Sequence, residues 1–210
     1  MSSTKIAAYL IASLLVGVLA VQYVRAVQPA IAHERYKAAA AACAKVPNMQ
    51  GEIAPPLISN PTLGRFPRLA PDFQAMDYTG KMVPLSAYRG KVVFLNFWAT
   101  WCGTCREEMP SMDKLQRQLG TNSFTILAVA SDDAWKKIHD YFPKGTAMSV
   151  LLDPPEQAEH EGGIAGTYGT TKLPETYLID KDGNLRYYFV STRNWADPRA
   201  IACIKALIAE

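Results

Sequence analysis

Two cysteines three residues apart, Cys102 and Cys105, have the spacing of a dithiol that can form and exchange a disulfide. Residues 92–98, just before them, are a mostly apolar run of β-branched and aromatic side chains, typical of a strand covered on both faces. Residues after them predict a helix, whose N-terminal N–H groups and dipole favour a thiolate at Cys102. Cys102 is therefore the expected attacking sulfur, and Cys105, one turn later, the resolving one.

Three other roles for this pair fit the sequence less well. Haem attachment needs histidine directly after the second cysteine, and residue 106 is arginine. A zinc site needs two more ligands at local spacing, but Cys43 and Cys203 are distant and single, and the three histidines form no His-x3-His pair. A purely structural disulfide across so short a loop would restrict the unfolded chain very little. Redox exchange is favoured, and we expect no metal and no cofactor.

Two segments carry a resemblance to a known family. Residues 96–110, Asn-Phe-Trp-Ala-Thr-Trp-Cys-Gly-Thr-Cys-Arg-Glu-Glu-Met-Pro, resemble the active-site segment of bacterial thioredoxin-like proteins of the TlpA, ResA and CcmG type, and TlpA most of all. Residues 173–180, Leu-Pro-Glu-Thr-Tyr-Leu-Ile-Asp, resemble the family's second signature, a cis-proline followed by a strand. The resemblance covers roughly residues 70–210. It implies an α/β thioredoxin fold, a central mixed sheet flanked by helices, and the activity of a protein-disulfide oxidoreductase.

The resemblance also assigns residues to client binding. In the family the proline matching Pro174 is cis and faces the two sulfurs, which leaves the backbone of Leu173 free to pair with an incoming polypeptide. The alternative is a trans proline in an ordinary loop. Trp98 is expected in the core, whereas Trp101, beside the attacking cysteine, is expected to rim the groove and contact clients.

Proton transfer requires a further group, because Asn96 stands where thioredoxin carries a buried aspartate. Glu108 follows Cys105 by three residues, hence by about one helical turn, and matches an acidic residue of ResA-type members. We expect Glu108 to tune Cys105 through desolvation or a water molecule. The alternative is a solvated helix glutamate like its neighbour Glu107.

The N-terminus predicts a membrane anchor. Residues 6–24 contain no charge, and at about 1.5 Å per residue they extend roughly 28 Å, enough to cross a bilayer once. We expect residues 1–27 to be a signal anchor in the bacterial inner membrane, with the catalytic domain on the periplasmic side. A cleaved signal peptide is the alternative, since residues 18–20, Val-Leu-Ala, are an acceptable cleavage context.

Charge separates the tether from the domain. Of the 22 Lys and Arg and the 19 Asp and Glu, residues 1–70 hold 7 and 2, and residues 71–210 hold 15 and 17. A nucleic-acid surface should lie on the folded domain, which is slightly acidic, so we expect no nucleic-acid partner. Residues 28–70 are predicted to be a helix and a Pro-rich tether, and residues 71–210 a single thioredoxin-like domain, with the protein a monomer.

Local patterns predict the remaining elements. Alanine-rich residues 33–44 predict a helix before Pro47, and Pro-rich residues 48–71 predict an extended tether or a segment laid over a sheet edge. Asp132 or Asp133 is expected to cap the helix 134–141, and Asp197 the final helix. Other expected helices cover 102–119 with a kink at Pro110, 157–168 and 197–209. Expected strands cover 73–78, 82–84, 92–98, 124–130, 149–152, 175–180 and 185–190, the last two joined by an Asp-Gly turn.

Cys43 and Cys203 lie outside the dithiol motif. TlpA also carries cysteines outside its active site, and in an oxidising compartment this pair could bridge and fix the tether to the last helix. We expect such a structural disulfide. Two unpaired thiols, with Cys203 as a small apolar residue of the helix, are the alternative.

Several functions remain open. The first is a membrane-tethered oxidoreductase that uses Cys-Gly-Thr-Cys to reduce disulfides of exported client proteins in cytochrome c or cytochrome oxidase copper-site biogenesis, with a membrane electron donor by family analogy. The second is an oxidant that introduces disulfides, because the Gly103-Thr104 pair does not decide the direction. The third, a redoxin-type peroxidase, needs threonine where Ala99 stands. A tethered binding module would not need both thiols.

Overall fold

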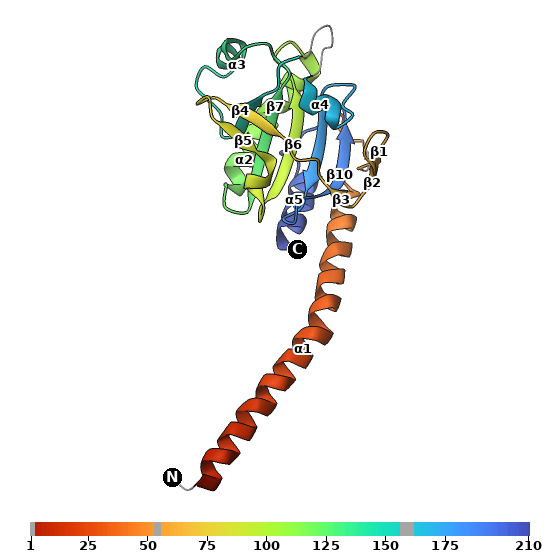
Figure 1. Ribbon diagram of the computed structural model, residues 1–210. Coiled ribbons are helices and arrows are strands. Elements are labelled where there is room, and N and C mark those ends of the chain that lie inside the picture. Colours follow the sequence, from red (N-terminus) through yellow and green to blue (C-terminus); the bar gives the residue numbers. More distant parts are fainter. Residues whose placement is uncertain (1–2, 53–55, 156–161) are drawn as a thin grey trace.

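The fold is built on a central mixed sheet (Figure 1). The structure, a computed structural model, describes residues 3–52, 56–155 and 162–210. Within these residues eight strands lie side by side in the order β3 (Arg68–Leu69), β10 (Asn184–Val190), β9 (Glu175–Ile179), β6 (Val92–Trp98), β7 (Phe124–Ala130), β8 (Ser149–Leu152), β4 (Gln74–Asp77) and β5 (Met82–Pro84). Strands β6, β7 and β8 are parallel, and the other pairings are antiparallel.

Strand β6 lies in the middle of this sheet. It pairs in parallel with β7 and antiparallel with β9, and every residue of both β6 and β7 is buried. This explains why their sequences are near-continuous apolar runs and do not alternate. The chain that leaves the end of β6 is therefore held by the best-buried part of the molecule.

Helices cover both faces of the sheet. Helices α2 (Gly103–Leu119), α3 (Trp135–Tyr141) and α5 (Pro198–Ala209), with the end of α1 (Ser3–Cys43), pack on one face and share one apolar core. The short helix α4 (Gly163–Thr167) and the 3-10 turn η1 (Leu85–Tyr88) lie on the other face, over a second core. The predicted α/β arrangement, a central mixed sheet flanked by helices, is confirmed.

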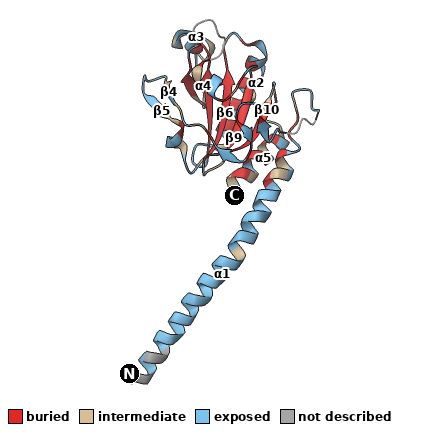
Figure 2. Cartoon of the chain, turned by 45° about the vertical axis from the view of Figure 1, so that its right-hand side comes forward, coloured by how far each residue is buried: buried red, intermediate tan, exposed pale blue. Residues whose placement is uncertain are grey.

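Helix α1 is longer than the sequence predicts. The helix predicted over residues 33–44 is confirmed as far as Cys43, but it is the last part of one helix that runs unbroken from Ser3, through Pro29. Both the uncharged stretch and the alanine-rich stretch favour helix, and Pro29, which lies between them, does not end it. Most of α1 is exposed and only its last turns are buried against the domain (Figure 2). Among the described residues it is the one helix long and apolar enough to cross a membrane. The boundary between residues 27 and 28 stays a prediction.

The Pro-rich segment lies against the sheet edge, the second of its two predicted arrangements. Strands β1 (Ser59–Asn60) and β2 (Gly64–Arg65) form a small hairpin, and β3 pairs with β10. The Leu57 N–H also donates to the Tyr188 carbonyl at 2.8 Å. Residues 53–55, within this segment, lie outside the described part of the chain.

Two helix caps and the extent of a third helix can be compared with the predictions. Asp197 caps α5 as expected, accepting the Arg199 N–H at 2.8 Å. Capping of α3 by Asp132 or Asp133 is wrong: its N-cap is Ala134, with no side-chain hydrogen bond, because Asp132 is buried and bonds elsewhere. The helix predicted over 157–168 is described from residue 162 onward, where α4 is short; residues 157–161 lie outside the described residues.

Candidate active site

Cys102 and Cys105 lie where β6 gives way to α2. Cys102 is the N-cap of α2, and its sulfur accepts the Cys105 N–H at 3.2 Å. The two sulfurs are bonded, 2.10 Å apart. Cys102 is 7% exposed and Cys105 is fully buried, so Cys102 is the sulfur nearer to solvent. An N-cap sulfur that accepts a backbone N–H is placed to carry negative charge, as an attacking thiolate requires.

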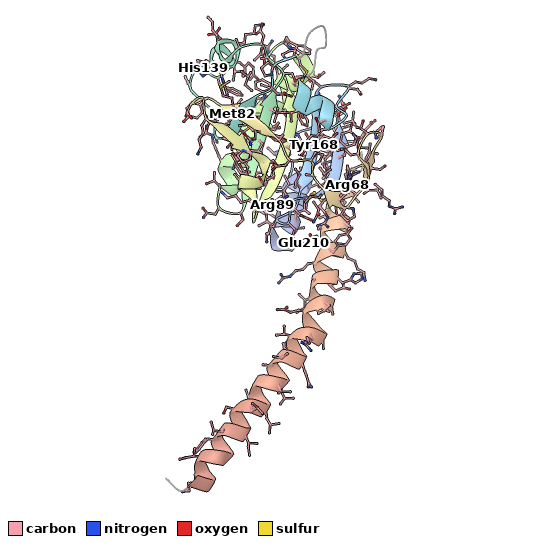
Figure 3. The ribbon with its side chains drawn as sticks, viewed as in Figure 1. Arg68, Met82, Arg89, His139, Tyr168 and Glu210 are labelled. Atoms are coloured by element: carbon pink, nitrogen blue, oxygen red, sulfur yellow. A yellow bond between two sulfur atoms is a disulfide. The ribbon has the colours of Figure 1, made fainter. Side chains whose placement is uncertain are left out.

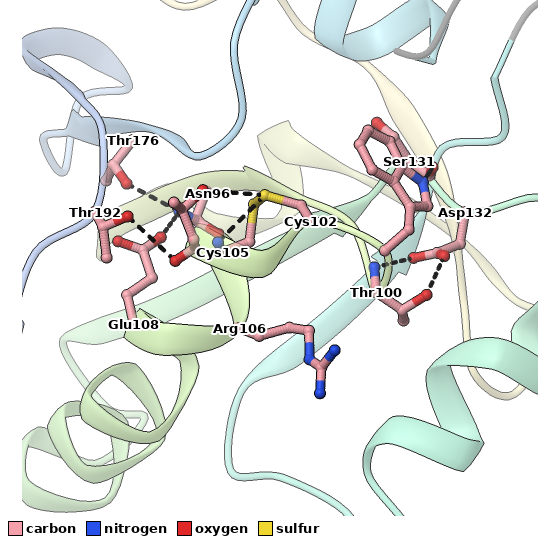
Figure 4. Close-up of a disulfide and its surroundings, with 12 residues drawn as sticks. Asn96, Thr100, Cys102, Cys105, Arg106, Glu108, Ser131, Asp132, Thr176 and Thr192 are labelled. Carbon is pink, nitrogen blue, oxygen red and sulfur yellow. Dashed lines mark hydrogen bonds between the residues drawn. A yellow bond between two sulfur atoms is a disulfide. The ribbon is translucent and has the colours of Figure 1, made fainter.

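The loop before Cys102 is fixed by the end of β7. The buried Asp132 carboxylate accepts the Thr100 N–H at 2.9 Å and its hydroxyl at 2.5 Å (Figure 4). The next residue, Trp101, donates its indole N–H to the Ser131 carbonyl at 3.3 Å and remains 53% exposed. An exposed indole held beside the disulfide can contact a client, whereas Trp98 is fully buried in the core.

Pro110 lies inside α2 and changes its hydrogen bonding. Proline has no N–H to donate to the carbonyl four residues earlier, which belongs to Arg106. The Tyr141 hydroxyl of α3 donates to that carbonyl at 3.4 Å. The freed carbonyl therefore has a partner, while the kink expected at Pro110 stays a prediction.

Pro174 lies at the same end of the sheet as the dithiol. The Leu173–Pro174 peptide bond is cis. Strand β9 begins directly after it, with Glu175 opposite Phe97 of β6, so Pro174 is level with the end of β6. The Pro174 carbonyl accepts the Ser191 N–H at 3.0 Å. The cis-proline loop is thus held by the residue that follows β10. A client-binding role for Leu173 and Pro174 stays a prediction.

Glu108 is buried beneath the dithiol and is not a solvated helix residue. It is 0% exposed, and its two carboxyl oxygens accept Asn96 Nδ2 at 2.9 Å, the Trp195 indole N–H at 3.1 Å and the Arg193 N–H at 3.2 Å. Burial raises the pKa of Glu108 from 4.5 to about 7, although these three donors and the Arg193 charge oppose the rise. A carboxyl with a pKa near neutrality can take up and release a proton at working pH.

Part of this carboxyl site cannot be read from local sequence. Asn96 is bonded to Glu108 and also donates to Thr176 Oγ1 at 3.0 Å. Arg193 and Trp195 come from the loop between β10 and α5, 85 and 87 residues after Glu108. No spacing rule connects residues so far apart, and the one signal that the sequence offers is Trp195, a large aromatic residue in an otherwise mostly polar segment.

Cys43 and Cys203 connect the end of α1 to the domain. Their sulfurs are 1.96 Å apart in a disulfide that joins α1 to α5, and both residues are buried. Nearer the N-terminal end of this contact, the Arg186 guanidinium lies over the Tyr36 ring at 4.4 Å and pairs with Glu210. The end of α1 is therefore packed onto the domain by apolar, aromatic and covalent contacts.

Comparison with known proteins gives the family. A profile of the AhpC/TSA family matches residues 68–188, more than half of the chain. The chain belongs to the AhpC/TSA family. Within it, the match to ResA proteins below and the two signature segments identify a protein of the TlpA, ResA and CcmG type.

Relatives in that family share the domain. The thiol-disulfide oxidoreductase ResA of Bacillus thuringiensis subsp. konkukian (strain 97-27) is 38% identical over 116 residues, which cover 55% of this chain and 64% of that protein. The chain thus matches less than two thirds of that relative's length. The ResA of Geobacillus thermodenitrificans (strain NG80-2) is 35% identical over 129 residues, 61% of this chain and 71% of that protein.

A solved structure supports the fold. A crystal structure from Chlorobium tepidum, assigned as the thiol:disulfide interchange protein DsbE, has a TM-score of 0.60 and 30% identity. It covers 68% of this chain and 96% of that protein. The AhpC/TSA protein described here therefore has a thioredoxin fold, to which a long apolar N-terminal helix is added.

Proposed function

We propose that the protein is a membrane-tethered thiol:disulfide oxidoreductase that reduces disulfides of exported proteins. Its main support is the position of the two bonded sulfurs: Cys102 caps α2 near the surface, and Cys105 is buried one turn later. The ResA relatives reported above are named thiol-disulfide oxidoreductases, which agrees with the exchange chemistry. Trp101, Leu173 and Pro174 would line the client groove, and Glu108 would serve the resolving cysteine.

The reaction proceeds in two exchange steps. The Cys102 thiolate attacks one sulfur of the client disulfide; a Cys102–client disulfide forms and the client's other sulfur leaves as a thiolate, which takes a proton. Cys105 then gives its proton to the Glu108 carboxylate and attacks Cys102 Sγ. The Cys102–Cys105 disulfide forms, the second client sulfur leaves and is protonated, and two electrons have passed to the client. A membrane electron donor must then reduce Cys102–Cys105.

Helix α1 supports the cellular location that we propose. Helix α1 would cross the bacterial inner membrane once, through residues 6–24, and hold the domain on the periplasmic side, where exported proteins acquire disulfides. Clients would be cysteine pairs of apocytochrome c or of a cytochrome oxidase copper site. In this compartment the Cys43–Cys203 bridge would be a structural disulfide.

A trapping experiment tests the proposed function. In Cys105→Ser the first exchange proceeds and the second cannot, so clients should accumulate as disulfide-linked adducts of Cys102 that reductant releases. In Cys102→Ser, the matched control, adducts should be absent, because Cys105 is buried and cannot be reached. Mass spectrometry of the adducts identifies the client cysteines. A Cys105→Ser protein that captures nothing, together with a wild type inert toward a model disulfide, rules the activity out.

The direction of transfer requires a separate measurement. The same two steps run in reverse would introduce disulfides. The direction of electron transfer depends on the reduction potential of the Cys102–Cys105 pair relative to that of the client pair. Equilibration with glutathione, followed by quantification of the reduced fraction, gives that potential. A value more negative than that of the client pair supports reduction; a more positive value supports the oxidant alternative.

A further inference from the structure

The loop between β10 and α5 contacts three parts of the candidate site. The Ser191 N–H donates a hydrogen bond to the Pro174 carbonyl at 3.0 Å. The Thr192 hydroxyl donates to the carbonyl of Thr104, which lies between the two cysteines, at 3.2 Å. The following Arg193 N–H reaches Glu108 at 3.2 Å. Ser191 has a left-handed φ of 72°, alone among the non-glycine residues described. Such a conformation at a non-glycine residue persists where surrounding contacts fix it.

Arg193 is a buried cation in this loop. Only 4% of the residue is exposed, its guanidinium lies over the Phe189 ring at 4.9 Å, and Nη1 donates to the Val190 and Ser191 carbonyls at 2.6 and 3.1 Å. A buried charge is strongly unfavourable unless an opposite charge or hydrogen bonds compensate it. Carbonyl oxygens solvate the guanidinium, and the Glu108 carboxyl stabilises its charge.

We propose that Arg193 is a positioning residue whose fixed positive charge keeps the Glu108 carboxyl ionised, and therefore able to accept the Cys105 proton, near neutral pH. The inference rests on the proposed function. Two observations support the effect: the Arg193 backbone N–H holds one Glu108 oxygen at 3.2 Å, and the guanidinium of the same residue is buried, so its charge is poorly screened from that carboxyl. Arginine suits this role because its guanidinium does not lose its proton in a protein.

The groups that act on Glu108 come from several elements. Asn96 on β6 and Trp195 in the loop are neutral donors, and Cys105 lies one turn earlier on the same helix. Cys203, on the α5 helix that packs in the same core, is bridged and does not titrate. Arg193 is the charged group among those that act on the Glu108 carboxyl, and its charge lowers the carboxyl pKa against the rise caused by burial. Removing that charge should raise the pKa further.

The experiment follows the resolving step against pH. Reduced protein is mixed with dithionitrobenzoate; the first coloured thiolate reports attack by Cys102, and the second reports attack by Cys105. In the wild type the second rate should rise through the Glu108 pKa, near 7. In the neutral variants Arg193→Gln and Arg193→Met the rise should move up by about one pH unit, which lowers the rate at pH 7 by about fivefold. Arg193→Lys should stay near the wild-type midpoint.

Matched controls separate charge from structure. Arg199, six residues later, is exposed and paired with Asp197, so Arg199→Gln should leave the profile unchanged. Glu108→Gln should remove the pH-dependent rise, and adding Arg193→Gln to it should shift nothing more. A uniform loss of rate at every pH in both neutral variants, or an equal shift in the Glu108→Gln background, overturns the inference.

A second readout keeps this test independent of the proposed function. The carboxyl carbon resonance of Glu108 can be titrated by NMR in the oxidised wild type and in both neutral variants, which requires no client. An unchanged Glu108 pKa overturns the inference even if exchange activity is intact. A wild type inert toward dithionitrobenzoate overturns the proposed function, while the NMR titration still decides the role of Arg193.

Discussion

At the scale of residues, Glu108 is the group whose environment and chemistry are most closely linked. A carboxyl placed in the core beneath the dithiol loses water, and three N–H donors with one buried cation return part of that solvation. The result is a pKa of about 7, between that of a solvated glutamate and that of an isolated buried one. The same burial that raises the pKa of Glu108 must also destabilise the fold when the group ionises.

The first prediction at this scale is a pH-dependent loss of stability. A carboxyl whose folded pKa, about 7, exceeds its usual 4.5 binds protons more tightly in the folded state. Stability is therefore unaffected by this group below pH 4.5 and decreases as pH rises from 4.5 to 7, by about 3 kcal/mol at 1.36 kcal/mol per unit. Denaturant unfolding of the oxidised protein, in which the cysteines do not titrate, measures this decrease.

Glu108→Gln is the decisive variant for that decrease, since glutamine has no proton to release. Its unfolding free energy should vary with pH about 3 kcal/mol less than that of the wild type. Glu107→Gln changes the exposed neighbour and should retain the wild-type slope. A wild-type slope in Glu108→Gln would mean that the carboxyl is not the group responsible.

The residues of this site that lie on one helix could be predicted from the sequence, whereas the residues that come from distant parts of the chain could not. Cys102, Cys105 and Glu108 follow one another at three-residue intervals, so helix periodicity alone places them on adjacent turns. Arg193 and Trp195 enter through a loop that depends on how α5 returns across the sheet. Contacts of this kind are set by tertiary packing and leave no periodic trace in the sequence.

At the scale of elements, the contact between α1 and α5 joins the long N-terminal helix to a helix that begins beside the candidate site. Cys43, near the end of α1, is bonded to Cys203, in the middle of α5. Helix α5 begins just after the loop that holds Glu108, so one short helix links the anchor contact to that carboxyl. The sequence predicted a helix over residues 33–44 and a final helix over residues 197–209, but not that the first is continuous with the uncharged N-terminal stretch, because Pro29, a residue that usually interrupts a helix, lies between them.

The prediction for this contact concerns stability without loss of exchange. The bridge closes a loop of 160 residues, and removing a disulfide from a domain typically costs about 2–5 kcal/mol. The double variant Cys43→Ser/Cys203→Ser should therefore unfold at lower denaturant concentration, by about 3 kcal/mol. Its exchange rate with a model disulfide should remain, because the bridge joins α1 to α5, whereas the dithiol lies at the start of α2. Equal stability in oxidised wild type and double variant would show that the bridge does not form in solution.

At the scale of the whole molecule, α1 and the dithiol lie at opposite ends of the domain. Glu210 lies beside the point where α1 meets the domain, and His139, on α3, lies at the far end (Figure 3). Tyr36 of α1 contacts Arg186 near the Asp180 end of β9, whereas the dithiol follows the other end of the sheet, where β9 begins. Residues 25–36 rise roughly 18 Å and β6 adds roughly 23 Å, so the dithiol stands on the order of 40 Å from the bilayer if residues 6–24 span it.

This distance predicts that stalk length matters for partners fixed in the membrane. Deleting residues 25–35, three helical turns, lowers the dithiol by roughly 16 Å and rotates it little. Combined with Cys105→Ser in intact cells, the deletion should reduce capture of membrane-anchored partners, because their cysteines would no longer lie at the height of Cys102. Replacing the same residues by an alanine-rich helix of equal length should preserve capture, and the isolated reaction with a model disulfide should be equal in both. Undiminished capture by the shortened chain would show that the stalk bends freely and does not set the height of the site.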